Sequence, residues 1–283
     1  MSERGARRAL TWGSARIGGG APAVVVPLTG PTTGDAAEQA RRAAAAGADA
    51  LELRVDLLDE VRRALEGAAP PPGEGPESLA GAAGRALEGL ARCGGAGPPV
   101  LLTCRTAAEG GGARVGEAAY RALLLAILEG LGAWAGPTRP AAIDVEVRRG
   151  CLPELAARAH ARGIDVVGSF HDLGGTPADA ELEAVLVRMA AQGADLAKVA
   201  VMPQSAEDVA RLLGVGARMS AGLEVPVAAI SMGALGAVSR VAPVFGSALT
   251  FAVVPDGRGE ARASAPGQLP IDEVRRCLGL LGG

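Results

Sequence analysis

Residues 164–201 read IDVVGSFHDLGGTPADAELEAVLVRMAAQGADLAKVAV, and this stretch contains a complete strand–helix–strand unit. Its two ends, 164–170 and 194–201, are apolar runs of the kind found in strands that are buried on both faces. Between them, residues 178–192 are rich in Ala, Leu and Glu, and a glycine follows directly, as it often does at a helix end. The stretch therefore predicts two parallel strands joined by a helix that covers them.

The same alternation repeats along the rest of the chain. Further strand-like runs lie at 23–28, 48–56, 99–105, 141–147, 225–231 and 247–254, and helix-like segments lie at 35–47, 117–134, 152–162 and 205–221. Eight strands that alternate with helices favour a single (βα)8 TIM barrel over an open doubly wound sheet. No G-x-G-x-x-G follows the first strand and there is no Walker A motif, so a nucleotide-binding open sheet has no support.

Two segments fall outside this alternation. Residues 1–22 precede the first strand, and we expect a short hairpin-like extension there that closes the bottom of the barrel. Residues 66–98 are rich in Gly and Pro at both ends, which predicts a loose connection with a short helix in its middle. Because neither segment indicates a second folding unit, residues 1–283 are expected to form one barrel domain.

The composition excludes several classes of protein. Net charge is −3 with acidic and basic residues interspersed, so neither a nucleic-acid partner nor a membrane surface is indicated. The longest apolar runs, near 122–135 and 225–238, are too short or too interrupted to span a bilayer, and no secretory signal begins the sequence. The four cysteines show no metal-ligand spacing. Reduced thiols in a cytoplasmic protein are therefore expected.

Lys198 is the only lysine among 28 lysine and arginine residues. It lies within an apolar strand, where an unpaired ammonium is costly and where burial lowers the pKa of the amine. Lysine, unlike arginine, can lose its proton and attack a carbonyl group. From this residue alone, a reactive amine and a buried ion pair are both open interpretations.

Polar side chains end one predicted strand after another. In a (βα)8 barrel the chemistry takes place at the carboxyl ends of the strands. The polar residues at or just beyond these ends are Glu52, Arg54, Asp56, Thr103, Arg105, Glu109, Asp144, Glu146, Ser169, His171, Lys198 and Ser231. Each has a structural alternative, for example an ion pair between Glu52 and Arg54. His160 lies instead in an Ala- and Arg-rich helix and is expected to be merely solvated.

The residue types at this rim indicate a reaction class. An amine and an imidazole without metal-ligand spacing or a nucleotide motif predict imine chemistry on a carbonyl compound, in which lysine forms the covalent link and histidine moves protons. Unpaired arginines at the same rim predict an anionic, carboxylated substrate. No metal or other cofactor is expected.

Seven motifs, in this order, resemble those of type I 3-dehydroquinate dehydratase. They are ELRVD, TCRTAAEGG, DVE, SFHD followed by TP, AKVAVMP, SMGALGAVSR followed by FGSALTFA, and SAPGQ. The resemblance runs from about residue 23 to 270. It implies a homodimeric (βα)8 barrel that needs no cofactor and that dehydrates 3-dehydroquinate to 3-dehydroshikimate in the shikimate pathway, which leads to chorismate and the aromatic amino acids.

By this resemblance, Lys198 forms the Schiff base, His171 is the general acid and base, and Glu109 assists the histidine. The family's substrate-binding positions fall on Glu52, Arg54, Arg105, Arg240, Ser264 and Gln268. Two positions depart from the family pattern, because Leu173 stands where phenylalanine is usual and Pro27 where some members have serine. Neither departure touches the catalytic set.

Two other functions remain as alternatives. A class I aldolase-like barrel would use the same lysine to cleave a carbon–carbon bond, although no glycine-rich phosphate cradle follows the last strands. A non-catalytic barrel would only bind a carboxylated metabolite, and it would tolerate arginine at position 198.

Overall fold

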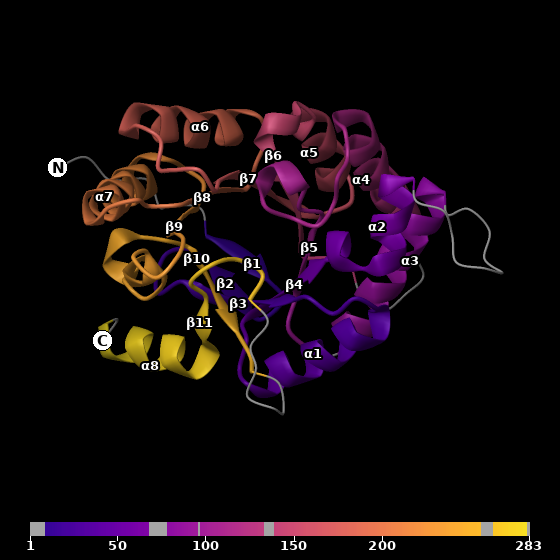
Figure 1. Cartoon of the computed structure of the whole chain (residues 1–283), viewed down its shortest axis with the longest axis horizontal. Coiled ribbons are helices and arrows are strands. Elements are labelled where there is room, and N and C mark those ends of the chain that lie inside the picture. Colours follow the sequence, from indigo (N-terminus) through magenta and orange to yellow (C-terminus); the bar gives the residue numbers. More distant parts are fainter. Residues whose placement is uncertain (1–8, 68–77, 96, 133–138, 256–262, 282–283) are drawn as a thin grey trace.

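Apart from an N-terminal hairpin, the described strands form one curled parallel sheet with helices around its outside (Figure 1). The computed structural model describes residues 9–67, 78–95, 97–132, 139–255 and 263–281. The strand order is β11-β10-β3-β4-β5-β6-β7-β8-β9, and neighbouring strands pair in parallel. The backbone N–H of Ala248 donates to the carbonyl of Val227 at 2.7 Å, which joins the start of β10 to β9. The predicted TIM barrel is therefore confirmed.

The barrel strands coincide with the runs that the sequence predicts. They are β3 Ala23–Leu28, β4 Ala50–Arg54, β5 Val100–Thr103, β6 Ala142–Glu146, β7 Asp165–Asp172, β8 Leu196–Val201, β9 Val227–Ser231 and β10 Leu249–Val253, with the two-residue β11 Leu269–Pro270 beside β10. Nearly all of their residues are buried, because one face packs under helices and the other points into the barrel.

Helices α1 to α8 surround the sheet. Their bounds are α1 Thr33–Ala45, α2 Asp59–Glu66, α3 Leu79–Gly94, α4 Glu117–Gly132, α5 Leu152–His160, α6 Asp179–Ala191, α7 Ala206–Gly222 and α8 Ile271–Leu281. Helices α1, α3 and α7 begin after Thr32, Ser78 and Ser205, whose side chains accept a hydrogen bond from the first turn. No helix in the described ranges is long and apolar enough to cross a membrane.

The segment 66–98 is more ordered than the sequence predicts. Helix α3 is 16 residues long, and it packs against α1, α2 and α4. Its Ala82, Ala86 and Leu90 are fully buried, so the predicted helix is present at 79–94, but it is longer than expected and packs firmly, and the expectation of a loose connection is wrong there. Residues 68–77 of this segment lie outside the described residues.

A hairpin closes the bottom of the barrel, as predicted. Strands β1 Leu10–Trp12 and β2 Ala15–Ile17 pair in an antiparallel manner. The buried side chains of Trp12 and Ile17 belong to the cluster that fills the lower barrel interior, together with Val167 of β7. The indole Nε1–H of Trp12 also donates to Asp165 Oδ2 at 2.9 Å. Residues 1–8 of the extension lie outside the described residues.

The barrel interior changes from apolar to polar along the strands. Alternate residues of a strand point to the same side, so inward positions recur every second residue. The lower inward positions include Ala50, Leu101, Ala142, Val167 and Leu196. The next inward positions on the same strands are Glu52, Thr103, Asp144, Ser169 and Lys198, all of them buried. Polar chemistry is therefore confined to the half of the barrel that holds the carboxyl ends of the strands.

Candidate active site

A cavity opens at the carboxyl ends of the strands. Its volume, including the solvent-filled mouth, is about 560 Å³. Its wall contains every site residue that the sequence predicts, namely Glu52, Arg54, Arg105, Glu109, His171, Lys198, Arg240, Ser264 and Gln268. These residues come from strands β4, β7 and β8 and from the segments that follow β5, β9 and β10. Closure of the barrel, not proximity in sequence, brings them together.

Lys198 lies deep in this cavity, on the inward face of β8. Its side chain is almost fully buried, with Nζ 3.6 Å from Asp144 Oδ2 and 4.4 Å from the centre of the Phe251 ring. Burial has the largest influence and lowers the pKa of this amine, although the carboxylates of Asp144 and Glu52 oppose the shift. The lysine therefore has a carboxylate neighbour and, at the same time, loses its proton more easily than an exposed lysine does.

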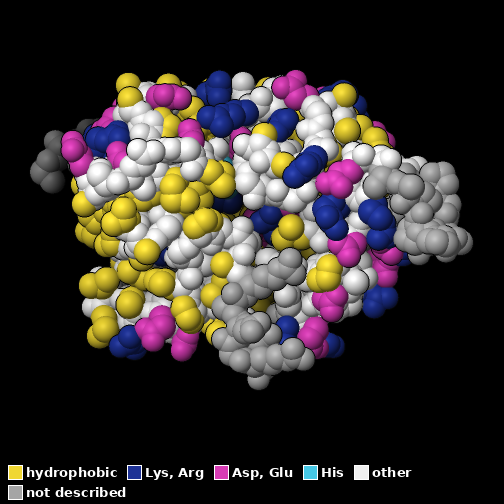
Figure 2. All heavy atoms as spheres, viewed as in Figure 1, with side chains coloured by type: hydrophobic (Ala, Val, Ile, Leu, Met, Phe, Trp, Pro, Cys, Tyr) yellow, Lys and Arg dark blue, Asp and Glu magenta, His cyan; other side chains and the backbone are white. Residues whose placement is uncertain are grey.

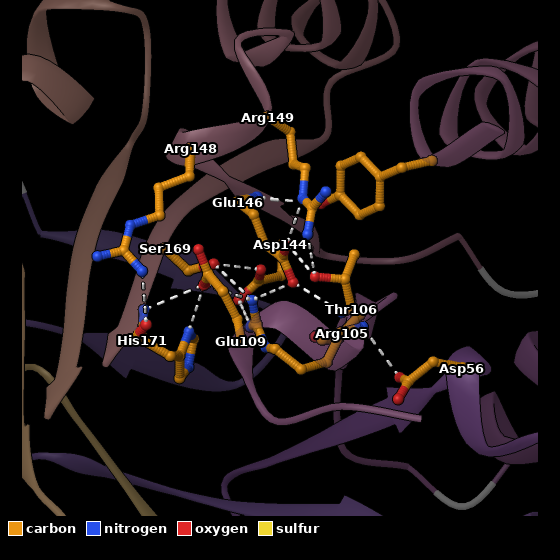
Figure 3. Close-up of polar contacts among 12 residues, drawn as sticks. Asp56, Arg105, Thr106, Glu109, Asp144, Glu146, Arg148, Arg149, Ser169 and His171 are labelled. Carbon is orange, nitrogen blue, oxygen red and sulfur yellow. Dashed lines mark hydrogen bonds and ion pairs between the residues drawn. The ribbon is translucent and has the colours of Figure 1, made fainter. Parts of the chain in front are cut away.

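His171, at the end of β7, is held by Glu109 (Figure 3). Glu109 Oε2 accepts the backbone N–H of His171 at 3.0 Å and lies 2.9 Å from its ring Nδ1. Burial lowers the pKa of His171 well below its ordinary value. Burial, assisted by the negative charge of Glu146, raises the pKa of Glu109 to about 8. With Nδ1 engaged by Glu109, Nε2 is the ring nitrogen left to exchange protons in the cavity.

The loop that carries Glu109 depends on glycines within residues 109–112. A Cβ atom on Gly111 would lie 2.0 Å from the carbonyl oxygen of Arg105, and a Cβ atom on Gly112 would lie 2.8 Å from that of Asp56. No side chain fits into either space, so the loop can fold back on the end of β5 only because both residues are glycine. The glycines that follow Glu109 therefore have a structural role, which is to let the loop present the Glu109 carboxylate to the cavity.

The two terminal nitrogens of Arg105 pair with carboxylates of β6 (Figure 3). Its Nη2 donates to Asp144 at 2.9 Å, and its Nη1 donates to Glu146 at 3.1 Å and to Ser169 at 2.9 Å. Although burial favours loss of its charge, these carboxylates raise the pKa of Arg105 above the ordinary value. The Ser169 hydroxyl donates to Asp144 at 2.6 Å and completes this network.

Arg54 is also paired, but with Asp56 and not with Glu52. Its Nε and Nη2 donate to the two oxygens of Asp56 at 2.8 and 2.7 Å. Glu52 instead accepts the hydroxyl of Thr103 at 2.9 Å. The suggested ion pair between Glu52 and Arg54 is therefore wrong.

Arg240, in the 3-10 helix Ala237–Arg240, is the cavity arginine without a carboxylate partner among the described residues. Within the described ranges, its guanidinium donates only to the carbonyl groups of Pro266 at 2.9 Å and of Phe251 at 3.4 Å, and its Nε has no partner. Burial lowers the pKa of Arg240 to about 10. The expectation of unpaired arginines is thus wrong for Arg54 and Arg105, and it holds for Arg240, where an anionic ligand would restore the missing charge.

Ser264 and Gln268 form one side of the mouth. The backbone N–H of Ser264 donates to Gln268 Oε1 at 2.9 Å, and Gln268 Nε2 donates back to the Ser264 hydroxyl at 3.1 Å. Pro266, between them, accepts the hydrogen bond from Arg240. The turn is therefore fastened to the same arginine that faces the cavity.

His160 does not line the cavity, yet it is not merely solvated. Its Nε2 lies 2.7 Å from Asp195 Oδ2, and this carboxylate also accepts the backbone N–H of Val166 at 3.0 Å. The expectation of simple solvation is therefore wrong. Within the described residues, no three His, Cys, Asp or Glu side chains gather in a way that could hold a metal ion.

A family model described as type I 3-dehydroquinase matches residues 24–283. The chain belongs to this family. It is 35% identical to the 3-dehydroquinate dehydratase of Lactiplantibacillus plantarum over 262 residues, which cover 92% of each protein. It is 42% identical to that of Listeria monocytogenes serotype 4a over 142 residues, or 49% of this chain, so this match spans about half (54%) of the relative's length.

Solved structures of the type I 3-dehydroquinase family share the whole fold. The enzyme from Clostridium difficile, solved with covalently modified comenic acid, superposes with a TM-score of 0.81 at 30% identity, and the match covers 98% of this chain and 99% of that one. The enzyme from Geobacillus kaustophilus gives a TM-score of 0.79 at 31% identity, with 97% and 96% covered.

The two departures from the family pattern occupy different parts of the barrel. Leu173 lies on the cavity wall and rests on Gly110, so a Cβ atom on that glycine would come within 2.8 Å of the leucine. Pro27 is buried in β3, directly beside Glu52 of β4. A proline has no side-chain donor, so this chain lacks the hydroxyl that some family members present there.

Several residues around the site were not assigned a role from the sequence. Phe251 and Met232 belong to the apolar wall of the cavity, and Phe251 lies against the lysine. Phe251 lies within the motif FGSALTFA, and only three phenylalanines occur in the chain, so both features could have drawn attention to it. Tyr120, whose hydroxyl accepts the backbone N–H of Glu146 at 3.0 Å, lies in a helix and gave no such indication.

Proposed function

We propose that the protein is a 3-dehydroquinate dehydratase that forms an imine between Lys198 and its substrate. One observation carries the proposal: a buried amine with a lowered pKa shares a cavity with the His171–Glu109 pair and with Arg240, a cation that has no anionic partner among the described residues. Membership of the type I 3-dehydroquinase family supports the same activity. No cofactor takes part in this proposal.

The first step joins the lysine to the substrate. The neutral amine of Lys198 attacks the ketone carbon, and loss of water from the adduct gives a protonated imine. The Asp144 carboxylate, 3.6 Å from Nζ, is placed to stabilise the positive charge of this iminium group. Because the iminium withdraws electrons, the protons on the neighbouring carbon become acidic.

The second step is elimination. Nε2 of His171 removes a proton from the carbon next to the iminium, and the electron pair forms an enamine. The enamine then re-forms the iminium and expels the hydroxyl group on the following carbon, which takes the proton from His171 and leaves as water. Hydrolysis of the conjugated imine releases 3-dehydroshikimate and the free Lys198.

The remaining cavity residues bind and orient the substrate. The substrate carboxylate pairs with Arg240, because that arginine has no carboxylate partner of its own in the described structure. The ring hydroxyls contact the carboxylate and guanidinium groups on the opposite wall and the amide and hydroxyl groups at the mouth; these residues are Glu52, Arg54, Arg105, Ser264 and Gln268. With the carboxylate fixed at Arg240, the ketone points toward Lys198.

We also propose that the protein is a cytoplasmic homodimer that acts in the shikimate pathway and binds neither nucleic acid nor membranes. Family resemblance supports the dimer, and so do the exposed apolar side chains of Leu235, Val238 and Val244. Figure 2 shows hydrophobic side chains gathered toward the left of the molecule. All four cysteines are free thiols, which supports a reducing compartment. Sedimentation analysis tests the dimer.

Borohydride trapping tests the proposed function. We expect borohydride to inactivate the protein only in the presence of substrate or product, and to leave one ligand mass on the peptide that contains Lys198. Lys198→Arg keeps the charge but cannot form an imine, so it should fold and bind but show neither adduct nor formation of the absorbing enone product. Normal turnover by the arginine variant would exclude imine catalysis. An adduct without dehydration would favour an aldolase-like reaction, and ligand binding with no adduct would favour a binding protein.

A further inference from the structure

Asp56 is a fully buried carboxylate that accepts four N–H donors. It lies in the short 3-10 helix Val55–Leu57, directly after β4. Its Oδ1 accepts from Arg54 Nε at 2.8 Å and from the backbone N–H of Arg105 at 3.0 Å. Its Oδ2 accepts from Arg54 Nη2 at 2.7 Å and from the backbone N–H of Gly112 at 2.9 Å. One side chain therefore joins the ends of two strands and a loop.

The contact with Arg54 fixes the direction of a cavity side chain. A bidentate pair between a guanidinium and a carboxylate restricts both groups to one plane. With Nε and one hydrogen of Nη2 engaged, the Nη1 group is the main donor left to the cavity. The geometry of Arg54 toward a ligand is thus set by Asp56 before any ligand arrives.

The contacts with Arg105 and Gly112 hold the two ends of the loop 105–112. The loop is held as one unit by hydrogen bonds from the N–H groups of Glu109 and Gly111 to the Thr106 carbonyl, and Thr106 is tied to Glu146. Asp56 joins this unit to the end of β4. Glu109 lies within the loop and reaches across to His171. The carboxylate of Asp56 therefore connects the loop that carries Glu109 to Arg54 and to the end of β4, although the side chains of Asp56 and Glu109 do not touch.

We propose that Asp56 is a positioning residue that couples the substrate-binding wall, through Arg54, to the proton-transfer pair, through the loop that presents Glu109. The inference rests on the proposed function for the roles of Arg54 and Glu109. Its structural basis, four hydrogen bonds on one buried carboxylate, is independent of that function.

Asp56→Asn tests the coupling with almost no change in shape. An asparagine has one acceptor oxygen and an NH₂ group, so it cannot accept all four donors. We expect KM to rise because Arg54 is released, and kcat to fall because Glu109 is displaced, for a combined loss in kcat/KM on the order of 10²-fold. Asp59→Asn makes the same chemical change three residues away, at a half-exposed pair with Arg62, and should leave both constants unchanged.

Two further measurements separate positioning from a general loss of stability. The pH profile of kcat/KM should shift by at least about 0.5 unit in Asp56→Asn, since the hydrogen bond between Glu109 and His171 sets the ionisation of that pair. Amide hydrogen exchange within 105–112 should become at least about tenfold faster, while exchange in α3 stays as in the wild type. Asp59→Asn should change neither quantity.

The outcomes separate a failure of the positioning role of Asp56 from a failure of the proposed function. A folded Asp56→Asn with wild-type kcat, KM and pH profile would overturn the proposal, and so would a rise in KM alone, because the loop would then be independent of Asp56. A wild-type protein that fails to turn over 3-dehydroquinate would contradict the proposed function instead. In that case, amide hydrogen exchange within 105–112 of Asp56→Asn still tests the positioning role of Asp56. Unchanged exchange would overturn that role, and faster exchange would support it.

Discussion

Lys198 and Arg240 are two buried cations in the same cavity with opposite surroundings. The lysine has the Asp144 carboxylate 3.6 Å away, whereas within the described part of the chain the arginine donates only to neutral carbonyl groups. An anion gains most beside the cation that has no partner, because there it restores a missing charge without competing with a carboxylate. In the proposed mechanism, these charges orient an oxo-acid substrate with its carboxylate at Arg240 and its ketone at Lys198.

His171→Ala should lower kcat on the order of 10²–10⁴-fold, the range that general acid–base catalysis contributes. The ring is held through Nδ1 by Glu109, so its removal leaves no other imidazole in the cavity wall. Steady-state assays of enone formation measure the loss. Retention of borohydride trapping in this variant would show that imine formation survives without the proton carrier.

His160→Ala is the matched control, because it removes the other histidine of the chain. Its kcat should stay within about twofold of the wild type. The lost hydrogen bond to Asp195 should lower the free energy of unfolding by about 0.5–1.5 kcal/mol. Equal activity losses in the two histidine variants would contradict the assignment of proton transfer to His171.

Glu109→Gln should stabilise the protein at alkaline pH while it lowers kcat. The pKa of Glu109 rises on folding from 4.5 to about 8. Between these two pH values the folded state therefore binds more protons than the unfolded state. The free energy of unfolding of the wild type therefore falls as pH rises from about 5 to about 8. Glutamine removes that dependence, and the variant should gain about 1–3 kcal/mol relative to the wild type at pH 8, less the cost of burying its NH₂ group.

Chemical denaturation at pH 5 and pH 8 measures this gain. Glu181→Gln, at an exposed position on α6, is the matched control. Its free energy of unfolding should differ from that of the wild type by the same amount at both pH values. A Glu109→Gln variant that is equally stabilised at both pH values would contradict the link between the raised pKa and stability.

At the scale of elements, the strands were predictable from the sequence, whereas the length and the packing of helix α3 were not. Runs of Val, Ile and Leu bounded by glycines identify buried strands because few other structures accept them. Helix α3 contains Gly81, Gly84 and Gly89, which lower helix propensity and shorten any helix predicted from sequence alone. Packing overrides this cost, since Gly89 lies under Leu53, whose nearest atom is 3.4 Å from where a Cβ would be.

The members of the site were predictable, but their pairing was not. The strand ends indicated which residues face the cavity, because inward positions alternate along a strand. Which carboxylate each arginine takes depends on strand register and on loop shape. Arg105 reaches the acids of the next strand, Asp144 and Glu146, whereas Arg54 turns to Asp56 on its own segment.

Gly111→Ala should displace the loop that carries Glu109. The added methyl carbon would lie 2.0 Å from the Arg105 carbonyl oxygen, so the backbone must move. A shift of about 1 Å at Glu109 is expected to lower kcat on the order of 10²-fold. Gly116→Ala, where nothing lies within 4 Å of the added atom, is the matched control. Equal kcat values in the two variants would show that loop shape does not govern the proton-transfer pair.

At the scale of the molecule, the two ends of the barrel have different roles. The hairpin packs apolar side chains into the bottom, while the polar groups of the cavity occupy the top. Stability and chemistry are thereby separated along the barrel axis, as in other barrels of this architecture. Substitutions at the bottom of the barrel should change the free energy of unfolding but not kcat or KM.

Trp12→Ala tests this separation. Removal of the buried indole should lower the free energy of unfolding by about 3–5 kcal/mol, while kcat and KM at 25 °C stay within about twofold of the wild type. Trp12→Phe keeps most of the packing but loses the hydrogen bond to Asp165, so a smaller loss of about 1 kcal/mol is expected. Urea denaturation and assays on the folded variants measure both. A large change in kcat would show that the bottom of the barrel controls the site.

The lone lysine also has a consequence for proteolysis. A protease that cuts only after lysine finds a single bond to cleave in these 283 residues, and that bond lies in the middle of β8, paired on both sides within the barrel wall. Such an enzyme needs an extended, exposed segment, which β8 provides only when the barrel opens as a whole. Cleavage into two fragments would thus report how often the entire barrel opens, and a ligand bound covalently to Lys198 would block it.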